Sequence, residues 1–364
     1  MTSRLLGQHA RRVAPYIPGE QPQDRSYIKL NTNESPFPPS PAVEQVLGQE
    51  GLAQGLRLYP DPDAGALARA VGDACGLPRE MVFCGGGSDE VLGYAFMAFA
   101  DPGDPVYFPD VTYGFYQVYA DLFGLDAKPI PLASDFTVRV ADYLGLDGNV
   151  FLANPNAPTG IALTPEQLRP MVEGNRDRLV VIDEAYIDFA PGLSCVPLTR
   201  EYDNLLVVQT FSKSRCLAGM RLGFAFGQPE LIQGLERMKY SFNPYNLDRV
   251  SLAVGAAAVR DGAYLLDCRD RIIATRSWTR QALEGLGLEV LPSQANFLFA
   301  RHPDLPGEAL YRGLRDRGIL VRHFDKPRIS DFIRLTIGTR EEMTRLVEAV
   351  TQQLREEAPC VPQH

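Results

Sequence analysis

The chain has 364 residues, 45% of them hydrophobic and 22% charged, which is the profile of a globular protein large enough for two domains. Its formal net charge of -9 excludes the broad positive surface that nucleic acids or anionic lipids require, so any bound anion must lie in a local pocket. Because the first twelve residues are polar without a signal-peptide core, and no apolar run reaches the roughly 18 residues of a membrane span, we expect a cytoplasmic protein.

The cysteines and histidines give no metal-binding pattern. Six cysteines are scattered without a CxxC pair, and the four histidines do not fall at metal-ligand spacing. Free cysteines usually behave as small hydrophobic residues, so we expect reduced, mostly buried thiols and no metal site. Cys216 is of particular interest because it lies three residues after Lys213.

The first forty residues are irregular and rich in proline, and the segment 31–40 is too polar for a core element. They form either a long ordered arm or a disordered tail. Ser40 followed by Pro41 is a typical helix start, with a capping hydroxyl before a proline at the first helical position. The globular body is therefore expected to begin there.

Six short apolar runs alternate with helical patterns from residue 81 onward. Several are continuous rather than alternating, as expected for strands covered on both faces, which favours a mainly parallel α/β sheet. In such sheets ligands bind at the carboxyl ends of the strands, so the polar residues after each run are candidates for chemistry. The runs are Met81–Cys84, Val106–Phe108, Val150–Ala153, Leu179–Ile182, Leu205–Val208 and Leu222–Phe226.

The pattern changes after a long helical stretch over residues 248–285. Strands are expected at 289–291, 296–300 and 332–337, and the capping box of Thr339 and Glu342 precedes a final amphipathic helix. This pattern is typical of a smaller α+β domain. The predicted organisation is an arm over residues 1–40, a large domain over 41–250 and a small domain over 251–364.

Three polar segments follow strands at the expected ligand-binding edge. Asp183 ends one strand with Tyr186 three residues on, and Lys213 follows the next strand among hydroxyls and an arginine, which suits a Schiff base beside a phosphate. The segment 85–90 opens a helix whose N-terminus suits a phosphate, but it is neither GxGxxG nor a P-loop, which argues against nicotinamide and nucleoside triphosphates. Taken alone, each segment has a structural alternative: a paired acid, a solvated lysine or a glycine turn.

Four motifs together resemble the signatures of one enzyme family. They match, in order and spacing, the fold-type I aminotransferases, which depend on pyridoxal 5'-phosphate. The resemblance covers nearly the whole chain and implies a large domain with a mainly parallel seven-stranded sheet plus a smaller α+β domain. The motifs are Gly87-Ser-Asp-Glu90, Asn156-Ala-Pro-Thr-Gly160, Asp183-Glu-Ala-Tyr186 and Ser212-Lys213 with Arg221.

The resemblance also implies a role for each matching residue. Lys213 corresponds to the Schiff-base lysine and proton shuttle, Asp183 to the partner of the pyridinium nitrogen, and Tyr186 to the hydroxyl on the cofactor's phenolic oxygen. Tyr113 corresponds to the aromatic residue stacked on the ring. The phosphate-binding positions are Gly87, Ser88, Asp89, Ser212 and Arg221, with Tyr59 reaching across from the neighbouring subunit of a homodimer.

One position departs from the family pattern. Many relatives have asparagine directly before Pro-Thr-Gly, where it bonds the phenolic oxygen, but this chain has Ala157. Asn156 and Asn154 are the two alternative sources of that amide.

Within the family, the chain is most similar to the members that transfer the amino group of L-histidinol phosphate to 2-oxoglutarate in histidine biosynthesis. This similarity implies that Arg334 grips the α-carboxylate of the amino donor, usually glutamate, and that Arg322 contacts the substrate phosphate. It also implies that the arm covers the active site, with Tyr16 and Asn33 near the substrate. The supporting segments are 13–20, 30–34, 58–62, 319–322 and 332–339.

Three alternatives stay open. A decarboxylase of threonine phosphate shares the fold, cofactor and phosphate recognition, but releases CO2. An aminotransferase for free aromatic amino acids would not depend on the charge of Arg322. A ligand-sensing regulator is disfavoured, because the first forty residues contain no helix-turn-helix pattern and because both Lys213 and Asp183 are present.

Overall fold

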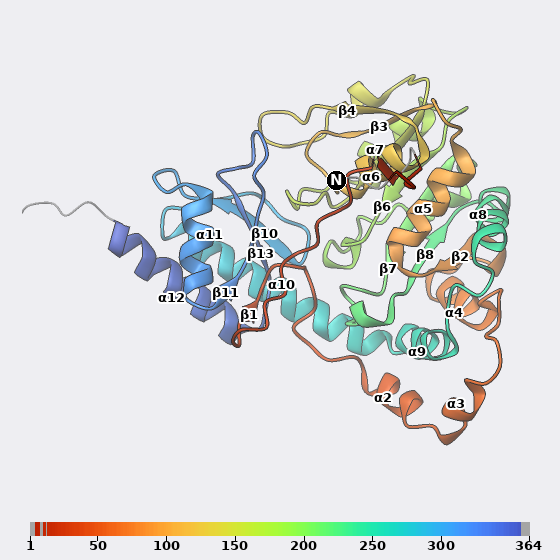
Figure 1. The fold of residues 1–364 in the computed structure, drawn as a ribbon, viewed down its shortest axis with the longest axis horizontal. Coiled ribbons are helices and arrows are strands. Elements are labelled where there is room, and N and C mark those ends of the chain that lie inside the picture. Colours follow the sequence, from red (N-terminus) through yellow and green to blue (C-terminus); the bar gives the residue numbers. More distant parts are fainter. Residues whose placement is uncertain (1–3, 8–9, 12, 358–364) are drawn as a thin grey trace, which may run out of the picture.

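The computed structural model describes residues 4–7, 10–11 and 13–357, which form two main sheets with their covering helices and one two-stranded sheet. In Figure 1 the larger sheet lies on the right and the smaller sheet on the left, next to the C-terminal helix. The larger sheet has seven strands in the order β2-β8-β7-β6-β5-β3-β4, and β8 alone runs antiparallel to its neighbours. The expected mainly parallel seven-stranded sheet is thus confirmed. Its strands are β2 (Val82–Gly85), β3 (Pro105–Pro109), β4 (Asp126–Ile130), β5 (Asn149–Ala153), β6 (Val180–Asp183), β7 (Leu205–Thr210) and β8 (Gly223–Phe226).

Apolar side chains on both faces explain why the central strands are continuous hydrophobic runs. One core contains Val180, Ile182 and Val207, and the core on the opposite face contains Val181 and Val208. The first face is covered by α2 (Pro41–Leu47), α4 (Gly65–Cys75), α7 (Pro165–Glu173) and α9 (Arg249–Arg260), with α3 (Glu50–Gly55) beside α9. The second face is covered by α5 (Gly87–Phe99), α6 (Phe115–Phe123) and α8 (Pro229–Phe242).

The smaller sheet is antiparallel, in the order β12-β13-β10-β9, and has its own core. Its strands are β9 (Glu289–Val290), β10 (Phe297–Arg301), β12 (Arg322–His323) and β13 (Ile333–Thr336), and its helices are α10 (Gly262–Glu284), α11 (Gly307–Asp316) and α12 (Arg340–Glu357). Short 3-10 helices complete the fold: η1 (Arg79–Met81), η2 (Val140–Tyr143), η3 (Ile187–Phe189), η4 (Val196–Arg200) and η5 (Ala218–Met220).

Of two helix caps predicted from the sequence, one is confirmed and one is not. Thr339 and Glu342 form the predicted capping box, in which each side chain accepts a hydrogen bond from the other residue's backbone N–H. Helix α2 does begin at Pro41, but the Ser40 hydroxyl makes no cap and has no hydrogen-bond partner among the described residues. The expectation of a capping hydroxyl at Ser40 was therefore wrong.

The long helical stretch expected over residues 248–285 is two helices that meet at Asp261. Helix α9 packs on α2 and α4, whereas α10 packs on α12 and β9. The Asp261 side chain accepts a hydrogen bond from the N–H of Tyr264 and so begins α10. On these contacts we propose that the boundary between the large and small domains lies at Asp261 rather than at residue 250. No helix in the described part of the chain is long and apolar enough to cross a membrane.

The N-terminal arm runs across both parts of the molecule. Strand β1 (Ile28–Lys29) pairs in parallel with β11 (Ile319–Leu320), and the carbonyl of Leu30 accepts a hydrogen bond from the N–H of Thr336. Further towards the N-terminus, Tyr16 stacks on Phe115 at the start of α6, with ring centroids 4.5 Å apart. The arm therefore contacts both parts of the molecule, through residues 28–30 on the side of the smaller sheet and through Tyr16 on α6 of the larger part.

Candidate active site

Asp183 is a buried carboxylate at the C-terminal end of β6. It is 4% exposed, and its two oxygens accept hydrogen bonds from the Tyr116 hydroxyl (3.0 Å) and the Ala185 N–H (3.2 Å). Burial raises the pKa of Asp183 to about 6, while both hydrogen bonds oppose the rise. No cationic side chain among the described residues forms an ion pair with it. A cationic ligand would stabilise the charged form of such a buried, unpaired acid.

Lys213 lies in the loop after β7, at the same edge of the sheet. Its ammonium group donates a hydrogen bond to the carbonyl of Thr32 in the arm (3.2 Å) and lies 5.9 Å from the centre of the Tyr186 ring. Burial, with Arg334 as the next cause, lowers the pKa of Lys213 to about 8. An amine with this pKa is partly neutral near physiological pH, which a nucleophile or proton carrier requires.

Tyr186 is fixed by the arm and by the smaller sheet. Its hydroxyl accepts a hydrogen bond from the Asn33 side-chain amide (2.9 Å), and its ring packs edge-on against Phe297 of β10. Asn33 has a positive φ of 55°, which asparagine tolerates better than most residues. Its backbone N–H donates to the Thr336 hydroxyl of β13. The arm thus links a residue of β13 to the residue predicted to contact the phenolic oxygen.

The predicted phosphate-binding residues gather where α5 begins. Arg221 donates to the carboxylate of Asp89 (3.0 Å) and to the hydroxyl of Ser212 (3.4 Å). Helix α5 starts at Gly87, so the backbone N–H groups of its first turn, including those of Ser88 and Asp89, are not used by the helix itself. Free N–H groups, a guanidinium and a hydroxyl together make an anion-binding site.

Glycine is required at two positions of this anion-binding site. Gly87 has a φ of +86°, and a Cβ atom there would lie 2.5 Å from the Arg221 guanidinium. A Cβ on Gly223 would lie 2.4 Å from the Ser88 backbone nitrogen. The close approach of β8 to the start of α5 therefore depends on both glycines.

Tyr113 is held beside this site by its hydroxyl. The hydroxyl donates to Asp89 (2.6 Å), so Asp89 bridges Tyr113 and Arg221. Burial raises the pKa of Tyr113 well above its ordinary value, so the hydroxyl stays protonated. Tyr16 of the arm lies 6.3 Å from Tyr113, centroid to centroid. The structure thus places an aromatic residue between the anion-binding site and the arm, as a stacking role requires.

The two asparagines considered as substitutes at position 157 are both engaged by the protein. The Asn156 amide donates to the Val111 carbonyl and accepts from the Thr112 hydroxyl, and Asn154 exchanges two hydrogen bonds with the backbone of Leu163. Ala157 itself packs with Ala295 and Phe297 against Tyr186. Both amide hydrogens of Asn156 are used within the protein, by the Val111 carbonyl and the Thr159 hydroxyl, whereas Asn154 donates one, to Leu163. Which group contacts the phenolic oxygen stays a prediction, and the Tyr186 hydroxyl is one further candidate.

Two arginines of the smaller sheet complete the candidate site. Arg334 donates to the carbonyl of Asn31 (3.1 Å), while its Nε has no hydrogen-bond partner in the described part of the chain. Arg322 donates to the carbonyls of Ile17 and Pro18 in the arm. Arg334 and Tyr186 both lie against the ring of Phe297, so they border the same space, and the charge of Arg334 contributes to the lowered pKa of Lys213. A partly buried guanidinium with an unpaired N–H suits a carboxylate.

Several residues that organise the site were missed at the sequence level. Tyr116, which bonds Asp183, and Thr336 and Asn296, which hold Asn33, are all buried. Thr336 is 303 residues away from Asn33 along the chain. No local pattern marks such contacts, although Tyr116, in the first turn of α6, lies only three residues after Tyr113, which precedes the helix.

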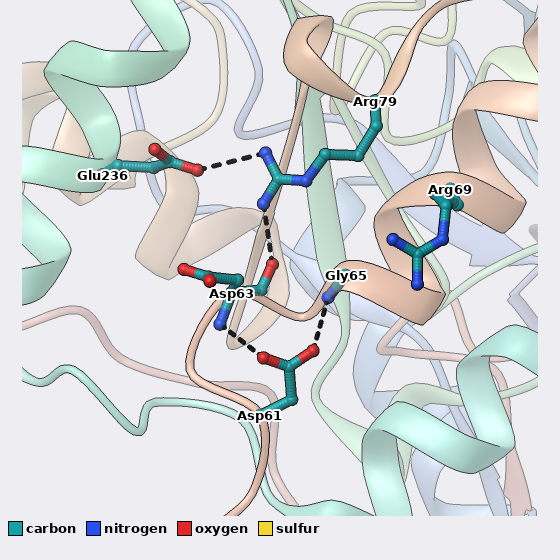
Figure 2. Close-up of a pocket in the computed structure, with 6 residues that line it drawn as sticks. All are labelled: Asp61, Asp63, Gly65, Arg69, Arg79 and Glu236. Carbon is teal, nitrogen blue, oxygen red and sulfur yellow. Dashed lines mark hydrogen bonds and ion pairs between the residues drawn. The ribbon is translucent and has the colours of Figure 1, made fainter.

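The hollow drawn in Figure 2 lies outside this site. Its volume is about 410 Å³, and none of its lining residues is among the predicted cofactor or substrate residues. Asp61 accepts hydrogen bonds from the backbone of Asp63 and Gly65, while Arg79 donates to the Asp63 carbonyl and pairs with Glu236. These bonds order the segment that follows Tyr59. We interpret the residues around the hollow as structural, since their hydrogen bonds and ion pair order this segment.

Comparison with known families decides the class of protein. The family model described as aminotransferase class I and II matches residues 25–350. The chain belongs to this family. Members depend on pyridoxal 5'-phosphate, so the predicted fold class, enzyme class and cofactor of this aminotransferase are confirmed.

Two relatives that match nearly the whole chain are histidinol-phosphate aminotransferases. The chain is 50% identical over 346 residues to a histidinol-phosphate aminotransferase of Brachyspira hyodysenteriae, covering 95% of this chain and 98% of the relative. It is 51% identical over 351 residues to that of Marinomonas sp., covering 96% and 99%. A solved histidinol-phosphate aminotransferase from Sinorhizobium meliloti, in complex with pyridoxal-5'-phosphate, has a TM-score of 0.89 at 24% identity, covering 98% of this chain and 99% of that chain. At that identity the structural match supports the fold alone.

Proposed function

We propose that this aminotransferase converts L-histidinol phosphate and 2-oxoglutarate to imidazole acetol phosphate and L-glutamate, a step of histidine biosynthesis. The observation that carries the proposal is the presence of two arginines, Arg322 and Arg334, on neighbouring strands at the arm-covered edge that holds Lys213. One guanidinium suits the carboxylate of glutamate and the other suits the phosphate of the amine. The extent of similarity to histidinol-phosphate aminotransferases supports the same substrate.

The residues present fit pyridoxal phosphate. Asp183 is a buried carboxylate without a cationic partner among the described residues, and the pyridinium N–H would supply one. Gly87, Ser212 and Arg221 form the anion-binding site for the phosphate, with the backbone of Ser88 and Asp89. When bound, the cofactor supplies an electron sink for the negative charge that develops at the substrate Cα.

The protein's own groups then have distinct tasks. Lys213 would hold the cofactor, and its lowered pKa suits it to move a proton at the substrate Cα. The Tyr186 hydroxyl, oriented by Asn33, would contact the phenolic oxygen. Tyr113 would stack on the ring. The arm excludes water from this site and brings Tyr16 towards the substrate.

The proposal includes a homodimer in which Tyr59 binds the cofactor phosphate of the other subunit. Tyr59 is 77% exposed, yet it stacks on Tyr245 and its carbonyl accepts a hydrogen bond from Arg249. Leu56 and Leu58 beside it are also exposed. A fixed aromatic side chain within an exposed apolar patch is typical of an interface. The cytoplasmic location expected from the sequence stays a prediction, which cell fractionation would test.

The test of the function is the visible spectrum of the protein loaded with pyridoxal phosphate, followed through successive additions. Histidinol phosphate should bleach the visible band and 2-oxoglutarate should restore it. Lys213→Ala should abolish the cycle, whereas Lys128→Ala, which removes an exposed lysine paired with Asp126, should not. A band that responds only to unphosphorylated aromatic amines would overturn the substrate, and release of CO2 from phosphothreonine would favour the decarboxylase. Absence of any band after adding cofactor would contradict the mechanism.

A further inference from the structure

Tyr116 makes the most direct side-chain contact with Asp183. It lies on α6, is fully buried, and its hydroxyl donates to Asp183 Oδ2 at 3.0 Å. Its ring packs edge-on against Tyr113, with centroids 5.8 Å apart. The residue predicted to stack on the cofactor ring and the residue that contacts its acidic partner are therefore in direct ring contact at the start of α6.

We propose that Tyr116 is a positioning residue that keeps the Asp183 carboxylate ionised and aimed at the pyridinium nitrogen of the cofactor. This proposal rests on the proposed function. A hydroxyl that donates to a carboxylate stabilises its charged form, and in a buried site the effect is larger than in water. The only other donor to the Asp183 carboxylate in the described structure is the Ala185 N–H, at a longer 3.2 Å.

The groups around Asp183 make this hydroxyl important. Burial favours the protonated acid, and the nearby negative charge of Asp89 acts in the same direction. Tyr119 and Tyr186 also face Asp183, but both are neutral because their pKa values are raised above the ordinary value. Tyr116 is itself fully buried with a pKa well above its ordinary value, so it always acts as a donor to Asp183. Among the residues that the structure describes, it is thus the one side chain whose hydrogen bond offsets the cost of ionising Asp183 before the cofactor binds.

Tyr143 provides a matched control. It is also a buried tyrosine of the large domain, but its hydroxyl has no hydrogen-bond partner in the described part of the chain. Tyr116→Phe and Tyr143→Phe therefore each remove one buried hydroxyl oxygen and leave the ring in place. Only the first removes a bond to Asp183.

The experiment measures the dissociation constant of pyridoxal phosphate from each apoprotein as a function of pH, beside kcat and KM of the loaded enzyme. Protonation of Asp183 should weaken binding at low pH, and in Tyr116→Phe this acid limb should move up by about one pH unit, with kcat about tenfold lower and KM nearly unchanged. Tyr143→Phe should match the wild type in both. The cofactor phosphate also titrates in this range, but it does so equally in all variants.

A second comparison places Tyr116→Phe in an Asp183→Asn background. The amide does not titrate, so removing the Tyr116 hydroxyl should then leave the acid limb unmoved. A shift of equal size in that background, or an acid limb in Tyr116→Phe that coincides with that of Tyr143→Phe, would overturn the proposal. If the wild type itself neither binds the cofactor nor transaminates, the proposed function fails instead, which separates the two results.

Discussion

Arg322 and Arg334 lie directly opposite each other on the antiparallel strands β12 and β13. Residues paired in this way project from the same face of a sheet, and two like charges so placed repel each other. Burial lowers the pKa of Arg334, and the charge of Arg322 lowers it further. Carbonyl groups of the arm bind both guanidinium groups. The pair is therefore a positive site that two anionic groups of the substrates would stabilise.

The substitution Arg322→Gln should affect the KM for the phosphorylated substrate more than the KM for unphosphorylated ones. Loss of a charge-assisted contact should raise KM for histidinol phosphate by about tenfold or more, while KM for an unphosphorylated aromatic amine should change by less than about twofold. Steady-state kinetics with both amines would measure the two effects. Arg312→Gln on the exposed face of α11, where the arginine pairs only with Glu308, is the control. Equal effects on both amines would mean that Arg322 merely holds the arm through Ile17 and Pro18.

The lowered pKa of Lys213 predicts how the apoprotein takes up its cofactor. Only the neutral amine attacks the aldehyde, so the rate of covalent uptake should rise with pH and level off above about 8, rather than rising towards the ordinary lysine value of 10.5. Arg334→Gln removes a positive charge that lowers this pKa, so its midpoint should move upward. Stopped-flow absorbance over a pH series would measure both midpoints. A wild-type midpoint near 10.5 would show that Lys213 is solvated and not activated.

The main sheet was predictable because its central strands are short, continuous apolar runs whose ends carry the polar residues of the site. Strand β4 was missed because its sequence, Asp126-Ala-Lys-Pro-Ile130, is half polar, as suits the edge of the sheet. Lys213 and Asp183 were found for the opposite reason, since Asp183 ends the apolar strand β6 and Lys213 lies three residues after the apolar strand β7. The parallel neighbours β6 and β7 bring their ends together.

Contacts made across long sequence separations were not predictable. Asn33 was picked out by resemblance alone, and its bonds to Tyr186 and Thr336 become visible only when the arm is folded over the site. The same holds for Asn156, whose amide hydrogen bonds are completed by the loop of Val111 and Thr112. Sequence indicates which residues are available for chemistry, but hydrogen-bond satisfaction depends on the three-dimensional surroundings.

Asp183 should destabilise the apoprotein at neutral pH. Its pKa is raised from 3.8 unfolded to about 6 folded, so its contribution to stability is complete below pH 4 and is lost as the pH rises through about 6. The free energy of unfolding of Asp183→Asn, relative to that of the wild type, should therefore increase by up to about 3 kcal/mol between low and neutral pH. Denaturant unfolding of both apoproteins at several pH values measures this difference. The contribution of the buried Glu184 is present in both proteins and cancels in the comparison. If the stabilities of the two apoproteins changed with pH in parallel, the raised pKa would be contradicted. With cofactor bound, the wild type should be more stable than Asp183→Asn.

Mixing two inactive variants should test whether Tyr59 acts across a dimer. Lys213→Ala removes the lysine from its own site, and Tyr59→Ala removes the exposed ring that would reach the partner's site. In a mixed dimer, the Lys213 of the Tyr59→Ala chain meets the Tyr59 of the Lys213→Ala chain and forms one complete site. Random exchange should therefore restore about one quarter of the wild-type activity at a cofactor concentration that loads the wild type but not Tyr59→Ala. The assay is the transaminase rate after co-refolding equal amounts, with each variant refolded alone as the control. If the mixture never exceeds the sum of the two separate rates although both variants form dimers, Tyr59 serves its own chain or no site at all.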